Sequence, residues 1–281
     1  MTMAPRSPRP RGLPRQVLTM TDELLQIRHL VVAFDAFHAV DDLDLTLHEH
    51  EVRFVIGPNG AGKTTLIDAI TNLVRPTSGS ILFDGAELVG RTEHAIVRAG
   101  IGRTFQTPSV FDELTVLENV DIAASFRLPF RSLLRRRKGM SDEVAQALES
   151  VNLSAQCEDA AGSLSHGQKQ WLEVAMVLVQ QPRLLLLDEP VAGMTEKERL
   201  RTGELVTQIA KDGTTVLVVE HDMDFVRRFA HKVTVMHEGK ILTEGTVAQV
   251  QQDETVREVY LGRPRDARGA AAATATATAT A

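Results

Sequence analysis

The chain has 281 residues, of which 43% are hydrophobic, enough for one globular domain with a sizeable core or a domain with a substantial insertion. Its 31 basic and 37 acidic residues give a formal net charge of −6, so the sequence lacks the basic footprint of a nucleic-acid-binding protein. The single cysteine, Cys157, excludes an internal disulfide framework and a cysteine metal cluster, and fits a reducing compartment.

Both ends of the sequence differ in composition from the rest. The first 20 residues contain four prolines, four arginines and no acid, and they lack the apolar core of a secretion signal. Met20 offers an alternative start that would remove nearly all of this segment. From Gly269 the chain ends in GAAAATATATATA, which has nothing large enough to pack. We expect disordered tails over 1–23 and 263–281 and one ordered domain over 24–262.

The first strand pattern lies at residues 42 to 47. Leu43, Leu45 and Leu47 alternate with polar residues, the period of a half-buried antiparallel strand. No apolar stretch in the chain approaches the roughly 20 residues of a membrane-spanning helix. If a membrane matters to this chain, a partner spans it.

The residues GPNGAGKTT fill every fixed position of the phosphate-binding loop pattern. A triphosphate is wrapped by backbone N–H groups at a helix N-terminus, and side chains at the glycines would block that approach. The preceding residues alternate as a strand would and LIDAI follows as a helix start, which argues against a chance glycine-rich turn. We expect Lys63 to reach the β- and γ-phosphates and Thr64 to bind Mg²⁺. The predicted ATP-binding residues of this loop are Gly57, Pro58, Asn59, Gly60, Ala61, Gly62, Lys63, Thr64 and Thr65.

Three further strands follow. Ile81 to Phe83, followed by Asp84 and Gly85, predicts a strand ending in a tight turn. Leu184 to Leu187 and Val216 to Val219 are continuous apolar runs, typical of strands buried on both faces of a parallel sheet.

Residues 91–161 show a helical pattern interrupted by loops, which predicts a helical insertion in the sheet domain. Within it, RSLLRRRK at 131–138 is the densest basic run. A solvated helix face or loop explains it; contact with acidic lipid headgroups or a membrane partner is the alternative.

Paired acids follow one of the buried strands. LLLLDEP places Asp188 and Glu189 at the carboxyl end of that strand, where open α/β sheets carry their ligand chemistry. Such a pair often only caps a helix, but here it follows a phosphate-binding loop in the same chain. We expect Asp188 to hold Mg²⁺ through water and Glu189 to polarise the water that attacks the γ-phosphate.

A second helix start with anion-binding character lies at residues 164 to 168. In LSHGQ, Ser165 can cap the helix and leave free N–H groups facing outward. Alone, the pentapeptide indicates only a capped helix. Its residues are Leu164, Ser165, His166, Gly167 and Gln168.

Together these motifs resemble those of the ATP-binding cassette (ABC) family. LSHGQ stands where that family has its signature motif, Gln106 where it has its Q-loop glutamine, and His221 where it has its switch histidine. Phe34 stands where the family stacks an aromatic ring on adenine. The motifs occur in the family's order, and the resemblance covers roughly Leu24 to Gly262.

The resemblance implies an α/β fold: a P-loop, RecA-like nucleotide-binding domain with an antiparallel β layer and an inserted helical subdomain at about 91–163. It implies ATP and Mg²⁺ as cofactors, with the metal near Thr64, Gln106 and Asp188, and catalytic roles for Glu189, His221 and Gln106. Two such subunits face each other head to tail, so that each ATP lies between the phosphate loop of one and the signature of the other.

Within the family, the chain resembles the ATPases of branched-chain amino-acid-type importers, and LSHGQKQWLE and DEPVAGMT look most like the urea-import subunit. Urea is therefore the expected cargo, and branched-chain amino acids are the alternative. Expected partners are membrane permease subunits, a second ATP-binding subunit that is a paralogue or a second copy, and, indirectly, an external solute-binding protein. The expected location is the cytoplasmic face of the inner membrane.

The sequence departs from the family pattern at three places. His166 replaces the usual middle glycine of the signature, Ala192 to Thr195 replace the usual D-loop with its aspartate, and His50 stands where many relatives have glycine. Since Ser165 and Gly167 remain, we expect the phosphate-contacting chemistry to survive.

Two other classes of protein share all or part of the pattern. Soluble ABC ATPases of translation or DNA repair share all the motifs but usually carry two cassettes or a long coiled-coil insertion, and a basic surface. A P-loop kinase would leave LSHGQ and His221 without a role. The import ATPase accounts for the whole set.

Overall fold

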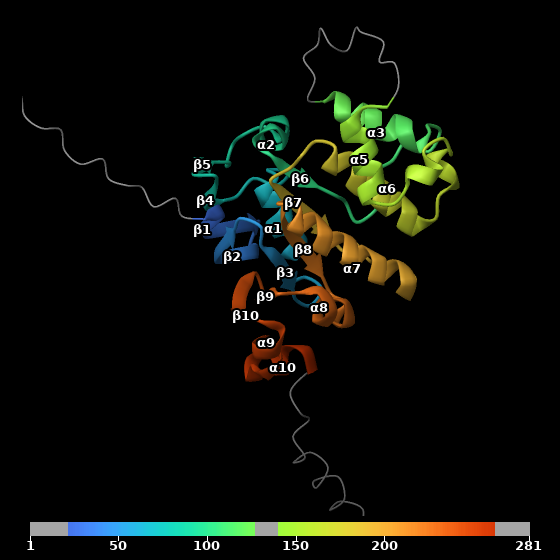
Figure 1. Cartoon of the computed structure of the whole chain (residues 1–281). Helices are drawn as coiled ribbons and strands as arrows, with labels where there is room; N and C mark the ends of the chain where they lie inside the picture. The colour runs from blue at the N-terminus through green and yellow to red at the C-terminus, as the bar shows by residue number, and fades with distance from the viewer. Residues whose placement is uncertain (1–21, 127–139, 262–281) are drawn as a thin grey trace, which may run out of the picture.

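The computed structural model describes residues 22–126 and 140–261 (Figure 1). The predicted tails lie almost entirely outside these residues, as does the basic run at 131–138. Among the described residues, no helix is both long and apolar enough to cross a membrane.

An antiparallel sheet forms one layer of the domain. Its strands run in the order β2-β1-β4-β5. Leu43, Leu45 and Leu47 are buried on β2, so the predicted half-buried strand is confirmed. Asp84 and Gly85 both take positive φ values at the predicted turn, 50° and 71°. The strands are β1 (Glu23–Phe34), β2 (Phe37–His48), β4 (Ser78–Phe83) and β5 (Ala86–Glu87).

A second, largely parallel sheet carries the phosphate loop, in the order β10-β9-β3-β8-β7-β6. Every residue of β3, β7 and β8 is buried, which confirms the two predicted double-sided strands. β10 pairs antiparallel with β9. The strands are β3 (Val52–Ile56), β6 (Ile101–Arg103), β7 (Leu184–Asp188), β8 (Thr215–Glu220), β9 (Lys232–His237) and β10 (Lys240–Gly245).

Helices α3, α5 and α6 form a lobe to one side of the sheets (Figure 1). The expected helical insertion, 91–163, also contains β6, which pairs with β7. Three residues are too few to show a strand period, so the sequence did not reveal β6. The helices are α1 (Lys63–Ile70), α2 (Glu93–Ala99), α3 (Val116–Ser125), α5 (Asp142–Ser150), α6 (His166–Leu178), α7 (Glu196–Lys211), α8 (Met223–Phe229), α9 (Val247–Gln252) and α10 (Glu254–Leu261).

The parallel sheet separates two hydrophobic cores. One core joins its face toward α1 to the antiparallel sheet, with Val55, Leu186 and Leu217 as members. The other core joins the opposite face of this sheet to α7, α8 and the helical lobe, with Phe54, Leu187 and Val218 as members. Successive residues of each strand thus serve opposite cores, which explains the unbroken apolar runs.

A buried arginine links three strands of this second sheet. The Arg53 side chain on β3 is fully buried and donates to Glu51 at 2.6 Å, to Glu244 of β10 at 2.6 Å and to Thr234 of β9 at 2.8 Å. Two carboxylates compensate the desolvated guanidinium. The hairpin of β9 and β10 is therefore bonded to the strand that enters the loop.

His50 occupies a left-handed position between β2 and β3, with φ 61°. Its ring Nδ1 lies 2.8 Å from the carbonyl oxygen of Gly213. A positive φ favours glycine because it lacks Cβ, so histidine adopts this conformation at an energetic cost.

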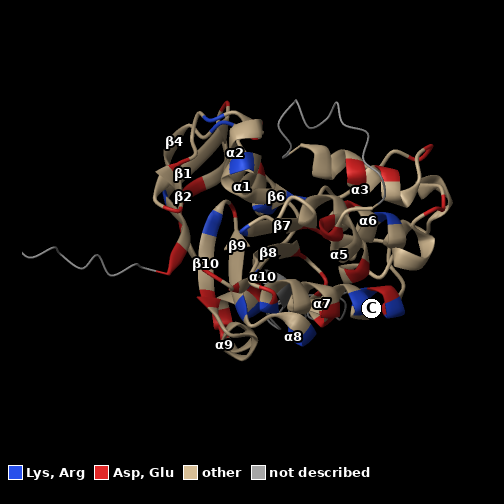
Figure 2. Cartoon of the chain, turned by 45° about the horizontal axis from the view of Figure 1, so that its top comes forward, with Lys and Arg blue, Asp and Glu red and all other residues tan. Residues whose placement is uncertain are grey.

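Acidic and basic residues are interspersed along the elements in the view of Figure 2. This distribution agrees with the modest formal net charge of −6. Counter-charge for a nucleotide must then be supplied locally, by residues at the phosphate loop.

Candidate ATP-binding and hydrolysis site

The phosphate loop joins β3 to α1, as the sequence predicts. Gly62 precedes the helix with φ 97°, and a Cβ there would lie 2.1 Å from the carbonyl oxygen of Ala39. A Cβ on Gly57 would lie 2.4 Å from the carbonyl oxygen of Met236. These two glycines are therefore also required by contacts with β2 and β9, a reason that the sequence did not reveal.

Lys63 is the first residue of α1 and is buried. Its ammonium donates to the carbonyl oxygens of Gly57 at 2.8 Å and Pro58 at 3.1 Å. Burial lowers the pKa of Lys63, while Glu189, Asp188 and Glu220 act in the opposite direction. The side chain folds over the loop, where phosphates of a nucleotide would meet it.

Asp188 ends β7 directly beside the loop. Its carboxylate accepts from the Thr64 hydroxyl at 3.4 Å and lies 3.5 Å from the Arg103 guanidinium. Burial raises the pKa of Asp188, Arg103 opposes this shift, and the neighbouring Glu189 adds to it. Thr64 and Asp188, both expected to bind Mg²⁺, thus lie side by side.

Glu189 is held between two other predicted residues. Its carboxylate accepts from Gln106 Nε2 at 2.9 Å and lies 3.2 Å from His221 Nδ1. Glu189 takes φ 49°, a conformation that costs energy in a non-glycine residue and occurs at functional sites. Gln106 and His221, from separate segments of the chain, therefore converge on the carboxylate of Glu189.

A cavity of about 450 Å³ opens over the phosphate loop. Gln106, Glu189 and His221 line it together with the loop residues Asn59 to Thr65. Its aromatic lining residue is Phe37, and the predicted adenine-stacking residue Phe34 is the cross-strand partner of Phe37 in the β1–β2 hairpin. In the sequence, the signal that could have indicated Phe37 as a lining residue was its position three residues after Phe34.

The residues around the loop suit Mg²⁺. Thr64, Asp188 and Gln106 offer hydroxyl, carboxylate and amide oxygens, the hard donors that this cation prefers. A cation would also relieve the repulsion between Asp188 and Glu189 that helps to raise the pKa of Asp188.

The signature motif begins α6. Ser165 caps the helix and accepts from the Gln168 amide, and Gln168 accepts from the Ser165 amide in return, so the predicted cap is confirmed. The Ser165 hydroxyl also donates to Glu198 of α7 at 3.2 Å. All five signature residues belong to the described part of the chain, and none of them lines the cavity over the phosphate loop.

The sequence-based prediction did not include two buried carboxylates near the site, those of Glu220 and Glu173. Glu220 accepts from the amides of Val191, His221 and Asp222, at 3.2, 3.1 and 3.3 Å, and burial raises its pKa. Glu173, on α6, accepts from amides of the loop that carries Gln106. An acid inside an apolar run, as in LEVA, or at its end, as in VLVVE, was the available signal in the sequence.

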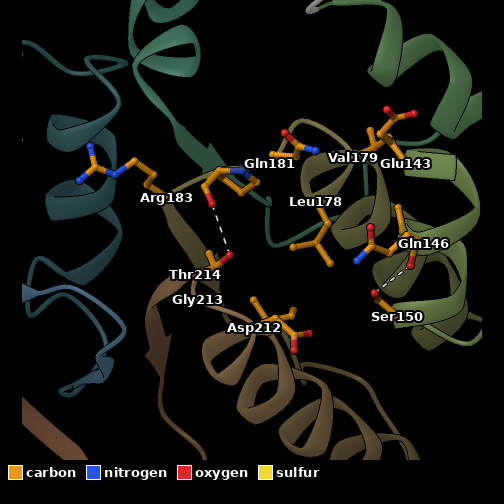
Figure 3. A pocket seen from close by; sticks show the side chains of 13 residues that line it. Glu143, Gln146, Ser150, Leu178, Val179, Gln181, Arg183, Asp212, Gly213 and Thr214 are labelled. Atoms are coloured by element: carbon orange, nitrogen blue, oxygen red, sulfur yellow. Dashed lines mark hydrogen bonds between the residues drawn. The ribbon is translucent and has the colours of Figure 1, made fainter. Parts of the chain in front are cut away.

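A second cavity, of about 330 Å³, lies between α5 and the turn from α7 to β8 (Figure 3). Arg183 borders it but extends away from it toward Asp84 and Glu49, with which it forms ion pairs at 2.6 Å. The predicted site residues are all in the described part of the chain, and none borders this cavity.

Comparisons with known proteins agree with this geometry. A family model described as ABC transporter matches residues 40–192, and one described as branched-chain amino acid ATP-binding cassette transporter matches 240–266. The branched-chain amino acid transport ATP-binding protein BraF of Pseudomonas aeruginosa is 36% identical over 256 residues, which cover 86% of this chain and 99% of BraF. LivG of Escherichia coli K12 is 36% identical over 253 residues, with the same coverage.

Solved structures match over the same range. A nucleotide-free ATP-binding cassette from an ABC transporter has a TM-score of 0.76 and 30% identity, covering 85% of this chain and 99% of that chain. A cassette in its ADP conformation has a TM-score of 0.77 and 31% identity, covering 86% and 100%. The chain therefore belongs to the ATP-binding subunits of ABC transporters, and it is of the branched-chain amino acid importer type.

Proposed function

We propose that this chain is the ATP-hydrolysing subunit of an importer and that Glu189 polarises the attacking water. As a member of its family, the chain is an ATPase coupled to transport. The observation that carries the assignment of Glu189 is its carboxylate, held between Gln106 and His221 beside the phosphate loop. A carboxylate fixed on two sides can orient a water molecule without first reorganising.

The other predicted residues take complementary roles in this proposal. Lys63 places a positive charge on the β- and γ-phosphates, and the N-terminus of α1 adds backbone N–H groups. Thr64, Asp188 and Gln106 would hold Mg²⁺, which supplies charge neutralisation to the triphosphate. His221 contacts the γ-phosphate side of the cavity, and Phe37 or Phe34 stacks on adenine.

A second ATP-binding subunit completes the site in this proposal. Ser165 and Gly167 start α6 outside the cavity, so a signature motif that contacts ATP would have to come from another subunit. That subunit is a paralogue or a second copy. Permease subunits hold the pair at the cytoplasmic face of the membrane, and an external binding protein delivers the solute.

For the cargo, branched-chain amino acids are better supported than urea. BraF and LivG are named for branched-chain amino acid transport, and the model matching 240–266 carries the same description. The urea hypothesis rests on LSHGQKQWLE and DEPVAGMT, which belong to the ATPase machinery and touch no cargo. Cargo selection belongs to the permease and the binding protein.

Uptake measurements test this function. Deleting this chain in its host is expected to abolish high-affinity uptake of labelled leucine at low concentration and to leave urea uptake unchanged. Restoring the wild-type chain should restore uptake, and the Glu189→Gln variant should not. Loss of urea uptake with normal leucine uptake would reinstate urea as the cargo, while rescue by Glu189→Gln would remove the proposed role of Glu189.

A further inference from the structure

The signature helix carries a buried carboxylate that no predicted role uses. Glu173 lies seven residues after the first residue of α6, and only 4% of its surface is exposed. Leu172 and Val174 beside it are core residues. Burying an acid in such surroundings is costly, and here burial raises the pKa of Glu173 to about 7.

The Glu173 carboxylate binds the loop that carries Gln106. Its oxygens accept from the Phe105 amide at 3.3 and 3.4 Å and from the Ser109 amide at 3.3 Å. These two amides lie on either side of Gln106 in the sequence. Gln170 Nε2, on the same helix, lies 3.5 Å from Glu173, and Arg103 of β6 is the nearby cation that opposes the pKa shift.

We propose that Glu173 is a positioning residue for Gln106, because it fastens both ends of the loop that places the Gln106 amide against Glu189. The Gln106 side chain is itself exposed and bonded to Glu189 at 2.9 Å. Because the Gln106 side chain is exposed, the backbone of its loop sets its position. Glu173 holds that backbone through the Phe105 and Ser109 amides. This inference rests on the proposed roles of Gln106 and Glu189.

The same helix begins at the signature. Ser165 caps α6 and Glu173 follows eight positions later, so about 12 Å of one helix separates the two residues. A displacement of α6 at its signature end would move the anchor of the Gln106 loop with it. Glu173 thus connects the signature, which faces the second subunit, to the hydrolytic residues of its own subunit.

Two substitutions at one position test the proposal in the assembled transporter. Glu173→Met keeps the volume but removes both acceptor oxygens, so kcat for ATP is expected to fall roughly 10- to 100-fold, with KM for ATP within about twofold. Glu173→Gln keeps one acceptor oxygen and is expected to stay within about threefold of the wild-type kcat. Because the apolar variant no longer buries a charge, its melting temperature is expected to equal or exceed that of the wild type at pH 8.

A control on the same helix separates positioning from stability. Trp171 donates its indole N–H to Thr202 at 2.9 Å, and Trp171→Phe removes that bond while leaving Glu173 in place. It is expected to lower the melting temperature without lowering kcat. If Glu173→Met fails to fold, Ser109→Pro tests the proposal from the loop side. This variant deletes the Ser109 amide N–H that donates to Glu173, and it is expected to lower kcat for ATP with KM unchanged.

Three results would overturn the inference: a folded Glu173→Met variant with wild-type kcat, a Glu173→Gln variant as slow as Glu173→Met, or full activity of Ser109→Pro. Glu189→Gln in the same assay distinguishes the two proposals. Normal ATP turnover by Glu189→Gln would defeat the proposed function itself. If Glu189→Gln loses turnover while Glu173→Met keeps the wild-type rate, only the role of Glu173 is defeated.

Discussion

Gln106 and Glu189 are 83 residues apart in sequence, and Gln106 Nε2 donates to Glu189 Oε2 at 2.9 Å. Gln106 follows β6 and Glu189 follows β7, and these two strands are parallel neighbours. The carboxyl ends of neighbouring parallel strands meet at one edge of a sheet, so this topology brings the pair together.

Replacing Glu189 by glutamine is expected to leave ATP binding intact and nearly abolish hydrolysis. The phosphate loop is untouched, whereas the attacking water loses its carboxylate. The closed dimer should accumulate with ATP, which size-exclusion chromatography and a phosphate-release assay would detect. Glu204→Gln, an exposed residue of α7, serves as the charge-matched control and should hydrolyse normally. Wild-type turnover by Glu189→Gln would contradict the assignment.

Lys63→Ala is expected to fail one step earlier, at nucleotide binding. The variant removes a charge from the β- and γ-phosphates and leaves the carbonyl oxygens of Gly57 and Pro58 without their donor. Equilibrium binding of a fluorescent ATP analogue should weaken by about 10-fold or more. Lys240→Ala, which removes an exposed lysine paired with Asp41 at 3.0 Å, should bind normally. Tight binding by Lys63→Ala would exclude this role for the ammonium.

The ionisation of Glu173 makes stability depend on pH in a defined direction. Its folded-state pKa is raised from about 4.5 to about 7, so its proton is bound more tightly in the folded protein than in the unfolded chain. The stabilisation is complete below pH 4.5 and is lost as the pH rises through about 7, a change of about 3 kcal/mol.

Urea denaturation at several pH values measures this change. The free energy of unfolding of the wild type minus that of Glu173→Gln should fall between pH 5 and pH 7 and then level off, since the glutamine cannot titrate. Taking the difference cancels the contributions of Asp188 and Glu220, whose pKa values are also raised. A pH-independent difference would show that Glu173 does not titrate in this range.

Two glycines of the phosphate loop form a matched pair for a test of packing. Gly60 and Gly62 both have positive φ values, 81° and 97°. A Cβ on Gly60 meets nothing within 4 Å, but a Cβ on Gly62 would lie 2.1 Å from the Ala39 carbonyl oxygen. We expect Gly60→Ala to cost about 1 kcal/mol and Gly62→Ala about 3 kcal/mol or more in the free energy of unfolding. Equal costs would show that backbone conformation alone requires glycine at both positions.

The elements that could be predicted from the sequence are those with a local signal. The alternation around Leu43, the apolar runs of β7 and β8 and the cap at Ser165 each depend on a few consecutive residues. The convergence of Gln106, Glu189 and His221 has no local signal and was inferred from the family resemblance. The geometry agrees with that inference, while the catalytic roles remain predictions.

The features that could not be predicted depend on register and long-range contact. The pairing of Phe34 with Phe37 in the hairpin fixes which ring lines the cavity, and the sequence does not specify that register. The carboxylate of Glu173 meets the Phe105 amide only after the helical lobe has packed against the sheet. The predicted domain boundaries also remain predictions, with β6 lying inside the expected helical insertion.

The buried guanidinium of Arg53 has a consequence for biosynthesis. One of its compensating carboxylates, Glu244, is 191 residues later in the chain. At about 5 to 20 residues per second, a ribosome needs roughly 10 to 40 s to add that partner after Arg53 has been made. Until then, the strand leading into the phosphate loop carries an incompletely neutralised charge, which opposes its burial. A nascent chain can therefore bury Arg53 with both compensating carboxylates in place only when the domain is nearly finished.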